Sequence, residues 1–457
     1  MLSRHWRVGS VRLAQPGAPP GPVESAAALS SPVGQSAAQP LVVAYNPVRQ
    51  AAFLFGLGFL FVELTVLHEL APIMLGFNTY LLYLIVPPAL FCGLLTGSVQ
   101  RTFRNRASWY WLAFYAWMIL ATPFSTWQGG SFARVVDSRI SLMMLIVVGG
   151  LATTWKEVRG IFYTIAGAAV VNLLTARLFM KTDEGRLSVG LTGFDIANSN
   201  DLAAQLLLVL PFALYLALGP GRNILVRLGV TATLGYGVWI ILQTASRGAL
   251  VAMGAMFLIF ILLGSARQRI IVIAAGGLIA IATLALLPGQ TLARLGSLFG
   301  EHYEEADESE ASRMYLFQKS LLYTVQHPIF GVGPDQFSNF EGGTAVASGQ
   351  IGSWHATHCA WTQVSSECGI PAMIFYIAGV VSAIRVVVRM RRAARDHGHT
   401  DIANACFCYL LGMTGFLVAI TFLANAYRYY VPAMIGLAVT MATAEPQVSS
   451  PSGKVDS

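Results

Sequence analysis

The sequence predicts an all-α polytopic membrane protein with about twelve transmembrane helices and one large periplasmic loop between the ninth and the tenth. Of its 457 residues, 55% are hydrophobic and only 11% are charged, and the mean hydropathy is +0.61. Soluble domains carry roughly 25% charged residues. The apolar runs are long and do not alternate in polarity, as in the unbroken stretch from Ala249 to Leu263. Helices, not barrel strands, are therefore expected to cross the bilayer.

Twelve apolar segments reach or approach the ~20 residues that a helix needs to cross the hydrocarbon core. Prolines at 87, 88 and 211 are expected to kink their helices, because proline lacks an amide hydrogen. The predicted spans are 51–68, 79–98, 108–125, 138–154, 158–176, 201–218, 224–243, 248–264, 269–287, 371–390, 404–422 and 427–443.

The basic residues predict how these helices are oriented. With a cytoplasmic N-terminus, 19 of the 29 lysine and arginine residues fall on the cytoplasmic side, as the positive-inside rule requires. Both termini are therefore expected in the cytoplasm. The other ten cations lie on the outer side against the rule, so some are candidates for binding an anion. They are Arg134, Arg139, Arg177, Lys181, Arg186, Arg247, Arg294, Arg313, Lys319 and Arg428.

The chain divides into five parts by composition. Residues 1–50 are rich in Ala, Pro, Gly and Ser and are expected to form a disordered cytoplasmic tail. Helices 1–9 occupy 51–287, the periplasmic loop 288–370, helices 10–12 occupy 371–443, and a second cytoplasmic tail covers 444–457.

Within the loop, residues 312–326 predict an amphipathic helix that lies on the membrane surface or under the loop. A turn with two glycines follows at 327–334. The apolar residues at helical spacing are Met314, Phe317, Leu321 and Leu322.

Two of the outer arginines occupy positions suited to an anion. Arg247 lies in a short turn between two long spans, where a charge is costly unless it is paired or faces a wet cavity. It is either an anchor that reaches lipid headgroups or a phosphate ligand, because a guanidinium offers two parallel donors. Arg313 begins the amphipathic helix. It is either a cation that offsets the acidic residues before it or a second clamp on the same anion.

Two histidines three residues apart, His355 and His358, follow later in the loop. Such a pair can share a helix face, but no further ligand pattern accompanies it, so no metal is predicted. A neutral imidazole can accept a proton near pH 7, which favours a general base. The structural alternative is a pair of hydrogen-bonded interfacial histidines.

Asn198 and Asn200 stand where the sixth predicted span enters the membrane from outside. Asparagine is an ordinary helix cap, and its amide can also bind sugar hydroxyls. No Walker loop, dinucleotide fingerprint, GxSxG or HExxH motif occurs, so no cofactor is predicted. The net charge of +7 on a membrane protein does not indicate a nucleic acid partner.

Taken in order, four elements resemble the O-antigen ligase and polymerase superfamily of bacterial envelope glycosyltransferases. In two places the chain departs from the family pattern: Cys359 follows the histidine, and Ser199 stands where proline is common. The stretch 358–371 is more similar to polysaccharide polymerases than to lipid A-core ligases. The matching elements are residues 198–203, Ser246-Arg247-Gly248, Arg313 with the turn 327–334, and His358 with Gly369 and Ala372.

The resemblance implies an inverting, metal-independent transfer of a glycan from undecaprenyl pyrophosphate to a hydroxyl of an acceptor glycan. It implies that Arg247 and Arg313 bind the pyrophosphate, that His358 is the base, and that His355 and Glu367 assist it. The site would face the periplasm from the bacterial inner membrane, with polysaccharide assembly proteins as further partners. Two alternatives remain open, a transporter or flippase of lipid-linked glycans and a protein O-oligosaccharide ligase.

Overall fold

A computed structural model of the chain describes residues 46–65, 75–77, 79–183, 186–189, 199–219, 222–266, 268–270, 273, 276–277, 289, 291, 304–349, 352 and 354–444. All of them belong to the compact unit Asn46–Ser457. Residues 1–45 of the predicted N-terminal tail, most of the predicted span 269–287 and the end of the C-terminal tail lie outside the described residues.

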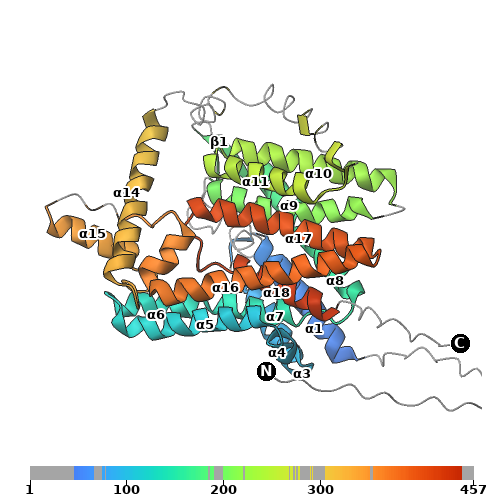
Figure 1. Cartoon of the computed structure of the whole chain (residues 1–457), viewed down its shortest axis with the longest axis horizontal. Coiled ribbons are helices and arrows are strands. Elements are labelled where there is room, and N and C mark those ends of the chain that lie inside the picture. Colours follow the sequence, from blue (N-terminus) through green and yellow to red (C-terminus); the bar gives the residue numbers. More distant parts are fainter. Residues whose placement is uncertain are drawn as a thin grey trace, which may run out of the picture. The chain divides into compact units, whose positions relative to one another are not determined.

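The described part is helical apart from one hairpin, in which strands β1 and β2 pair antiparallel with Met180 opposite Val189 (Figure 1). The elements are α1 (Pro47–Leu64), α3 (Leu81–Leu95), α4 (Ser98–Thr102), α5 (Arg106–Ala121), η1 (Thr122–Phe124), α6 (Gln128–Asp137), α7 (Arg139–Gly149), α8 (Trp155–Phe179), β1 (Met180–Asp183), β2 (Arg186–Val189), α9 (Ser199–Leu218), α10 (Ile224–Gln243), α11 (Arg247–Leu263), α14 (Glu304–Gln326), α15 (Phe337–Ala347), α16 (Ala360–Asp396), α17 (Thr400–Ala419), η3 (Ile420–Phe422) and α18 (Tyr430–Ala444).

These helices confirm the predicted class, a helical membrane protein. Six described helices are long and apolar enough to cross a bilayer, namely α1, α8, α9, α10, α16 and α17 with η3. Three shorter apolar helices, α3, α11 and α18, coincide with further predicted spans. The number of twelve spans and the limits of the loop stay predictions.

Several boundaries differ from the predicted ones for local reasons. Helix α1 begins at Pro47, inside the predicted tail, because Asn46 caps it and proline suits the first helical position. Helices α6 and α15 were not predicted. Helix α16 joins the end of the predicted loop to the tenth span, although its backbone breaks at Gly369, where φ is +84°.

Neighbouring helices bury a shared core. Helix α16 packs against α5, α17 against α9, and α18 against α7. At the α5–α16 contact three large rings, Trp111, Phe114 and Tyr376, are fully buried and lie edge to face or tilted against each other. By contrast α3 exposes Tyr83, Phe91 and other large apolar side chains, as expected of a lipid-facing surface.

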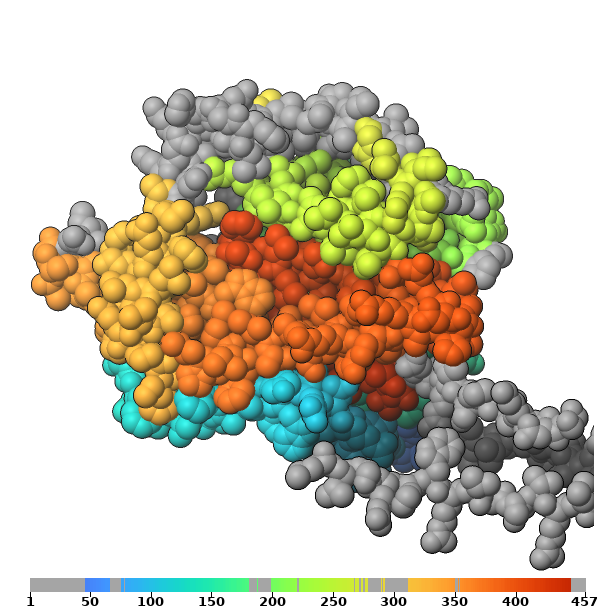
Figure 2. Space-filling view, viewed as in Figure 1, coloured from blue at the N-terminus to red at the C-terminus, as the bar shows by residue number. Residues whose placement is uncertain are grey.

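Helix α14 is longer than predicted and packs by a different face. It runs across the direction of the long helices and lies against α16 (Figures 1 and 2). Its buried apolar residues, Leu316 and Tyr323, pack with Val332 and Phe337 beyond the turn. The tyrosine hydroxyl faces inward because Glu341 on α15 accepts its hydrogen bond. The face expected to be apolar is exposed, and consists of Met314, Phe317, Leu321 and Leu322.

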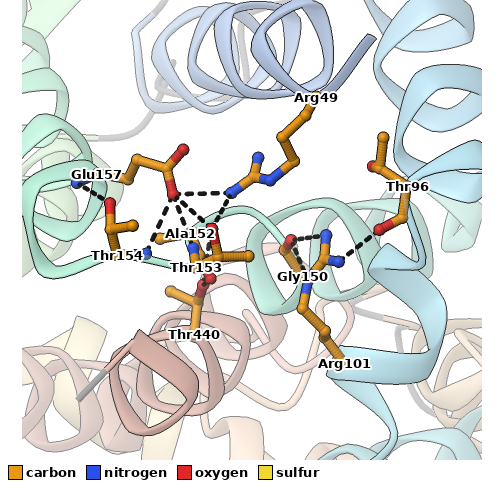
Figure 3. Close-up of polar contacts among 9 residues, drawn as sticks. All are labelled: Arg49, Thr96, Arg101, Gly150, Ala152, Thr153, Thr154, Glu157 and Thr440. Carbon is orange, nitrogen blue, oxygen red and sulfur yellow. Dashed lines mark hydrogen bonds and ion pairs between the residues drawn. The ribbon is translucent and has the colours of Figure 1, made fainter. Parts of the chain in front are cut away.

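One end of the bundle gathers arginines that bind helix ends and carboxylates (Figure 3). Arg49 pairs with Glu157 at 2.7 Å, and Arg101 donates to the backbone oxygens of Gly150 and Thr96, which end two helices. A cation is favourable there because carbonyl dipoles point out of a helix C-terminus. Arg391 reaches Leu263, the last residue of α11. The first residue of α11 is thus ~25 Å away, at the opposite end.

Candidate active site

A cavity of about 390 Å³ lies at the end of the bundle opposite this arginine cluster. It brings together Arg247, Arg313 and His358, the three residues that the sequence singled out from separate segments. Helix α11, helix α14, the segment before α16 and the 3-10 turn η3 each contribute to it. Its lining residues are Arg247, Gly248, Val251, Arg313, Met314, Phe317, Thr357, His358, Cys359, Thr421 and Phe422.

Local chemistry explains why Arg247 opens a helix at the cavity. Ser246 is the N-cap of α11, and its side chain accepts a hydrogen bond from the amide of Ala249. The first turn of α11 contains no acidic residue. The guanidinium therefore adds to the positive end of the helix dipole, a combination that favours an anion.

Gly248 allows η3 to approach α11 closely. A Cβ atom at this position would lie 2.9 Å from the Cδ2 atom of Phe422, too close without movement of the ring. Phe422 also lines the cavity, so the glycine helps to shape it. In the Ser246-Arg247-Gly248 motif, the serine caps α11, the arginine supplies a positive charge and the glycine allows the close approach of Phe422.

Arg313 lines the main cavity and a smaller adjoining space. The smaller space also contains Asn200 and Ser246, so Asn200, whose amide could bind sugar hydroxyls, lies near Arg313. Asn198 lies outside the described residues. Asp201, next to Asn200, accepts a hydrogen bond from the side chain of Asn425 at 2.8 Å.

His358 enters the cavity from a tight segment before α16. Its φ angle is +52°, in the left-handed region that non-glycine residues rarely adopt. Burial, the nearby charge of Arg313 and then that of His355 lower the pKa of His358 to about 4. The imidazole is consequently neutral at pH 7 and able to accept a proton.

Besides Asn198 and Asn200, two predicted site residues are not among those that line the cavity. His355 is exposed and influences His358 through its charge. Glu367 is only 2% exposed, and its side chain binds backbone amides and a buried hydroxyl instead of facing the cavity. Its carboxylate accepts hydrogen bonds from the Tyr427 hydroxyl at 2.6 Å, the Asp335 amide at 2.9 Å and the Phe337 amide at 3.4 Å.

Glu367 thereby fastens the glycine-containing turn to α16. The amide of Gly333 also binds the carbonyl oxygen of Glu367, and Ile370 binds that of Pro328. At Gly369 a Cβ atom would lie 2.0 Å from the backbone oxygen of Ile329. The turn at 327–334 and the Glu367–Pro371 segment therefore pack together through direct backbone contacts.

Sequence reasoning missed Arg134 as a member of this scaffold. Its guanidinium pairs with Asp335 at 2.8 Å and lies over the ring of Tyr427. Burial acts to lower the pKa of Arg134, but the charge and hydrogen bond of Asp335 outweigh it and raise the pKa. A distant carboxylate thus explains one of the outer cations, and no local pattern could have revealed it.

Part of the sequence matches a known protein family. Residues 232–377 match the family described as O-antigen ligase. This segment of the chain is similar to the O-antigen ligase family. This confirms the resemblance to the O-antigen ligase and polymerase superfamily. No curated protein matches the chain significantly.

The matched segment contains every predicted site residue except Asn198 and Asn200. It runs from the second half of α10 through Arg247, Arg313 and His358 to the part of α16 just beyond Gly369. The family supports a membrane glycosyltransferase that uses a lipid-linked glycan donor and a glycan acceptor. All residues that line the cavity belong to the matched segment except Thr421 and Phe422.

Proposed function

We propose that the chain transfers a glycan from undecaprenyl pyrophosphate to a hydroxyl of an acceptor glycan. The observation that supports this most directly is the single cavity lined by two arginines and a neutral histidine. An anionic leaving group and a poor hydroxyl nucleophile require those two kinds of group. The acceptor makes the protein either a surface polysaccharide polymerase or an O-antigen ligase.

Arg247 and Arg313 bind the pyrophosphate and neutralise the charge that develops as it leaves. Together they provide two positive charges, so the proposed reaction is independent of a metal. Donors fixed in advance against such developing charge typically contribute ~3–4 kcal/mol each to lowering a barrier. The apolar lining residues Met314, Phe317 and Val251 lie beside them. They suit the start of a polyprenyl chain.

His358 takes the proton of the acceptor hydroxyl. In the site without donor its lowered pKa makes it a weak base, partly because of the charge of Arg313. A bound pyrophosphate offsets that charge and raises the pKa toward the range in which a general base is most effective. Donor binding therefore prepares the base.

The bond changes follow directly from these roles. The acceptor oxygen attacks the anomeric carbon from the side opposite the pyrophosphate and forms the new glycosidic bond. The bond from that carbon to the pyrophosphate oxygen breaks, undecaprenyl pyrophosphate leaves, and the hydroxyl proton moves to His358. One displacement inverts the configuration of the anomeric carbon.

The cavity end faces the periplasm and both termini are cytoplasmic. The opposite end carries Arg49, Arg101, Arg159 and Arg391, as the positive-inside rule expects of the cytoplasmic side. A lipid-linked donor would then be used after it has crossed the inner membrane, where polysaccharide assembly proteins are natural partners.

Transfer by the reconstituted protein tests this function. Lipid-linked oligosaccharide extracted from the native cells serves as the donor, and the same oligosaccharide released by mild acid serves as the acceptor. Wild-type protein is expected to join them, and His358→Ala to lose activity by about 10²–10⁴-fold. Normal product formation by His358→Ala would refute the assignment of His358 as the base. Donor crossing the bilayer with no joined product would indicate a flippase, and glycopeptides formed only with this chain would indicate a protein ligase.

A further inference from the structure

Trp354 is a large exposed aromatic residue four positions before His358. The residue is 55% exposed. A chain of four residues spans at most ~14 Å, so the indole lies within the length of a short oligosaccharide from the base.

One side of the indole lies on backbone. At Gly342 on α15, a Cβ atom would come within 2.5 Å of the Cδ2 and Cε3 atoms of Trp354. At Gly352 a Cβ atom would come within 3.1 Å of its Nε1 atom. The two glycines let the ring pack directly on the chain, and the exposed part of the ring therefore faces away from α15.

Helix α15 is itself fastened to the helix that carries Arg313. Glu341, next to Gly342 and only 1% exposed, accepts hydrogen bonds from Tyr315 at 2.6 Å and from Tyr323 on α14. Figure 1 shows α15 beside α14. Helix α15, which supports the indole of Trp354, and helix α14, which carries Arg313, are thus joined by hydrogen bonds.

The backbone of the connecting segment is also constrained. Trp354 and His358 both adopt positive φ angles, +51° and +52°. Non-glycine residues rarely adopt this region and persist there where the surrounding structure determines them. The two side chains that this segment presents are therefore held in defined directions.

We propose that the exposed face of Trp354 is a stacking platform for a sugar ring of the acceptor glycan. The face of a pyranose carries C–H groups that pack on an aromatic ring, while its hydroxyls stay in water. A membrane-interface anchor is the competing role of an exposed tryptophan. The surroundings favour sugar, because apart from Val346 the exposed residues of α15 after Gly342 are small or polar.

This inference rests on the proposed function, and acceptor kinetics test it separately. With the donor saturating, Trp354→Ala is expected to raise the acceptor KM about tenfold, equivalent to about 1.4 kcal/mol, with little change in kcat or in the donor KM. Trp354→Tyr should keep most of the affinity. Gly342→Ala, which displaces the indole, should act in the same direction as Trp354→Ala.

Trp127→Ala is a matched control. Trp127 is 60% exposed and likewise lies against a glycine, Gly130, but it is remote in sequence from His358. Its removal should leave the acceptor KM unchanged. An equal rise in both variants would overturn the platform.

Fluorescence supplies a readout that a purely structural role would not change. Titrating the released oligosaccharide should alter the tryptophan emission of the wild type, and Trp354→Phe should lack that change. An unchanged acceptor KM in Trp354→Ala, while His358→Ala is inactive, would refute the platform and leave the function standing. Quenching of Trp354 by brominated lipids, with no effect of glycan, would identify a membrane anchor instead. Loss of the function itself would appear as wild-type protein without transfer.

Discussion

Arg313 and His358 line the same cavity, and after burial the charge of Arg313 is the largest cause of the lowered pKa of His358. The cation that would bind the donor therefore also controls the base. This coupling predicts how activity depends on pH.

The acid limb of the kcat/KM profile is expected to reflect a free-enzyme pKa near 4, and that of kcat a higher pKa. His358 must be neutral to act, so activity falls as the pH drops through each value. Arg313→Gln should move the kcat/KM limb toward higher pH, and Arg313→Lys should not. If the acid limb of the kcat/KM profile stays at the same pH in Arg313→Gln, Arg313 does not control the pKa of His358.

Removal of either cavity arginine should slow transfer without unfolding the protein. Arg247→Ala and Arg313→Ala are each expected to lower kcat about 10²–10³-fold, because a donor to the developing charge is lost. Arg139→Ala, which alters a more exposed arginine paired with Asp137, is the control and should retain activity. Comparable losses in all three variants would exclude a specific role.

Glu367→Gln should affect stability more than chemistry. The side-chain carboxyl group accepts hydrogen bonds from the Tyr427 hydroxyl and from two backbone amides. Impairing such a network typically costs about 1–3 kcal/mol. Thermal unfolding in detergent should show a lower Tm, with near-normal activity per folded molecule. If Glu367→Gln keeps full stability but loses transfer activity, Glu367 acts on the substrate and not in the scaffold.

Gly369→Ala is expected to destabilise the protein strongly. Its φ of +84° and ψ of 174° lie in a region almost restricted to glycine, which costs another residue about 1–3 kcal/mol, and the added Cβ would collide with the carbonyl oxygen of Ile329. Gly343→Ala is the control, since a Cβ there meets nothing within 4 Å. The yield of folded protein and the Tm measure the effect, and equal behaviour of the two variants would disprove the contact.

Labelling of cysteines tests the proposed orientation. Ser348→Cys, at the end of α15, should react with a membrane-impermeant maleimide in intact spheroplasts. His397→Cys, at the far end of α16, should react only after the membrane is opened. Both native side chains are exposed, and wild-type protein corrects for its own cysteines. The reverse pattern would invert the topology.

Much of the fold follows from local patterns. Long apolar segments predicted α1, α8, α9, α10 and α17 to within a few residues, because a bilayer requires helices of that length. Helices α6 and α15 escaped notice because they are short and Gly-rich, and neither forms an apolar span. The buried face of α14 was also missed, since a polar contact between Tyr323 and Glu341 outweighs the apolar pattern.

For the candidate site, too, local sequence features identified some residues, whereas only the tertiary structure established other features. Arg247, Arg313 and His358 could be found from residue type, position against the positive-inside bias and motif order, all of which are local. Their meeting in one cavity, the fastening role of Glu367 and the packing of Trp354 on Gly342 depend on segments far apart along the chain. Such contacts arise when helices pack, because packing brings together side chains whose separation no local pattern encodes.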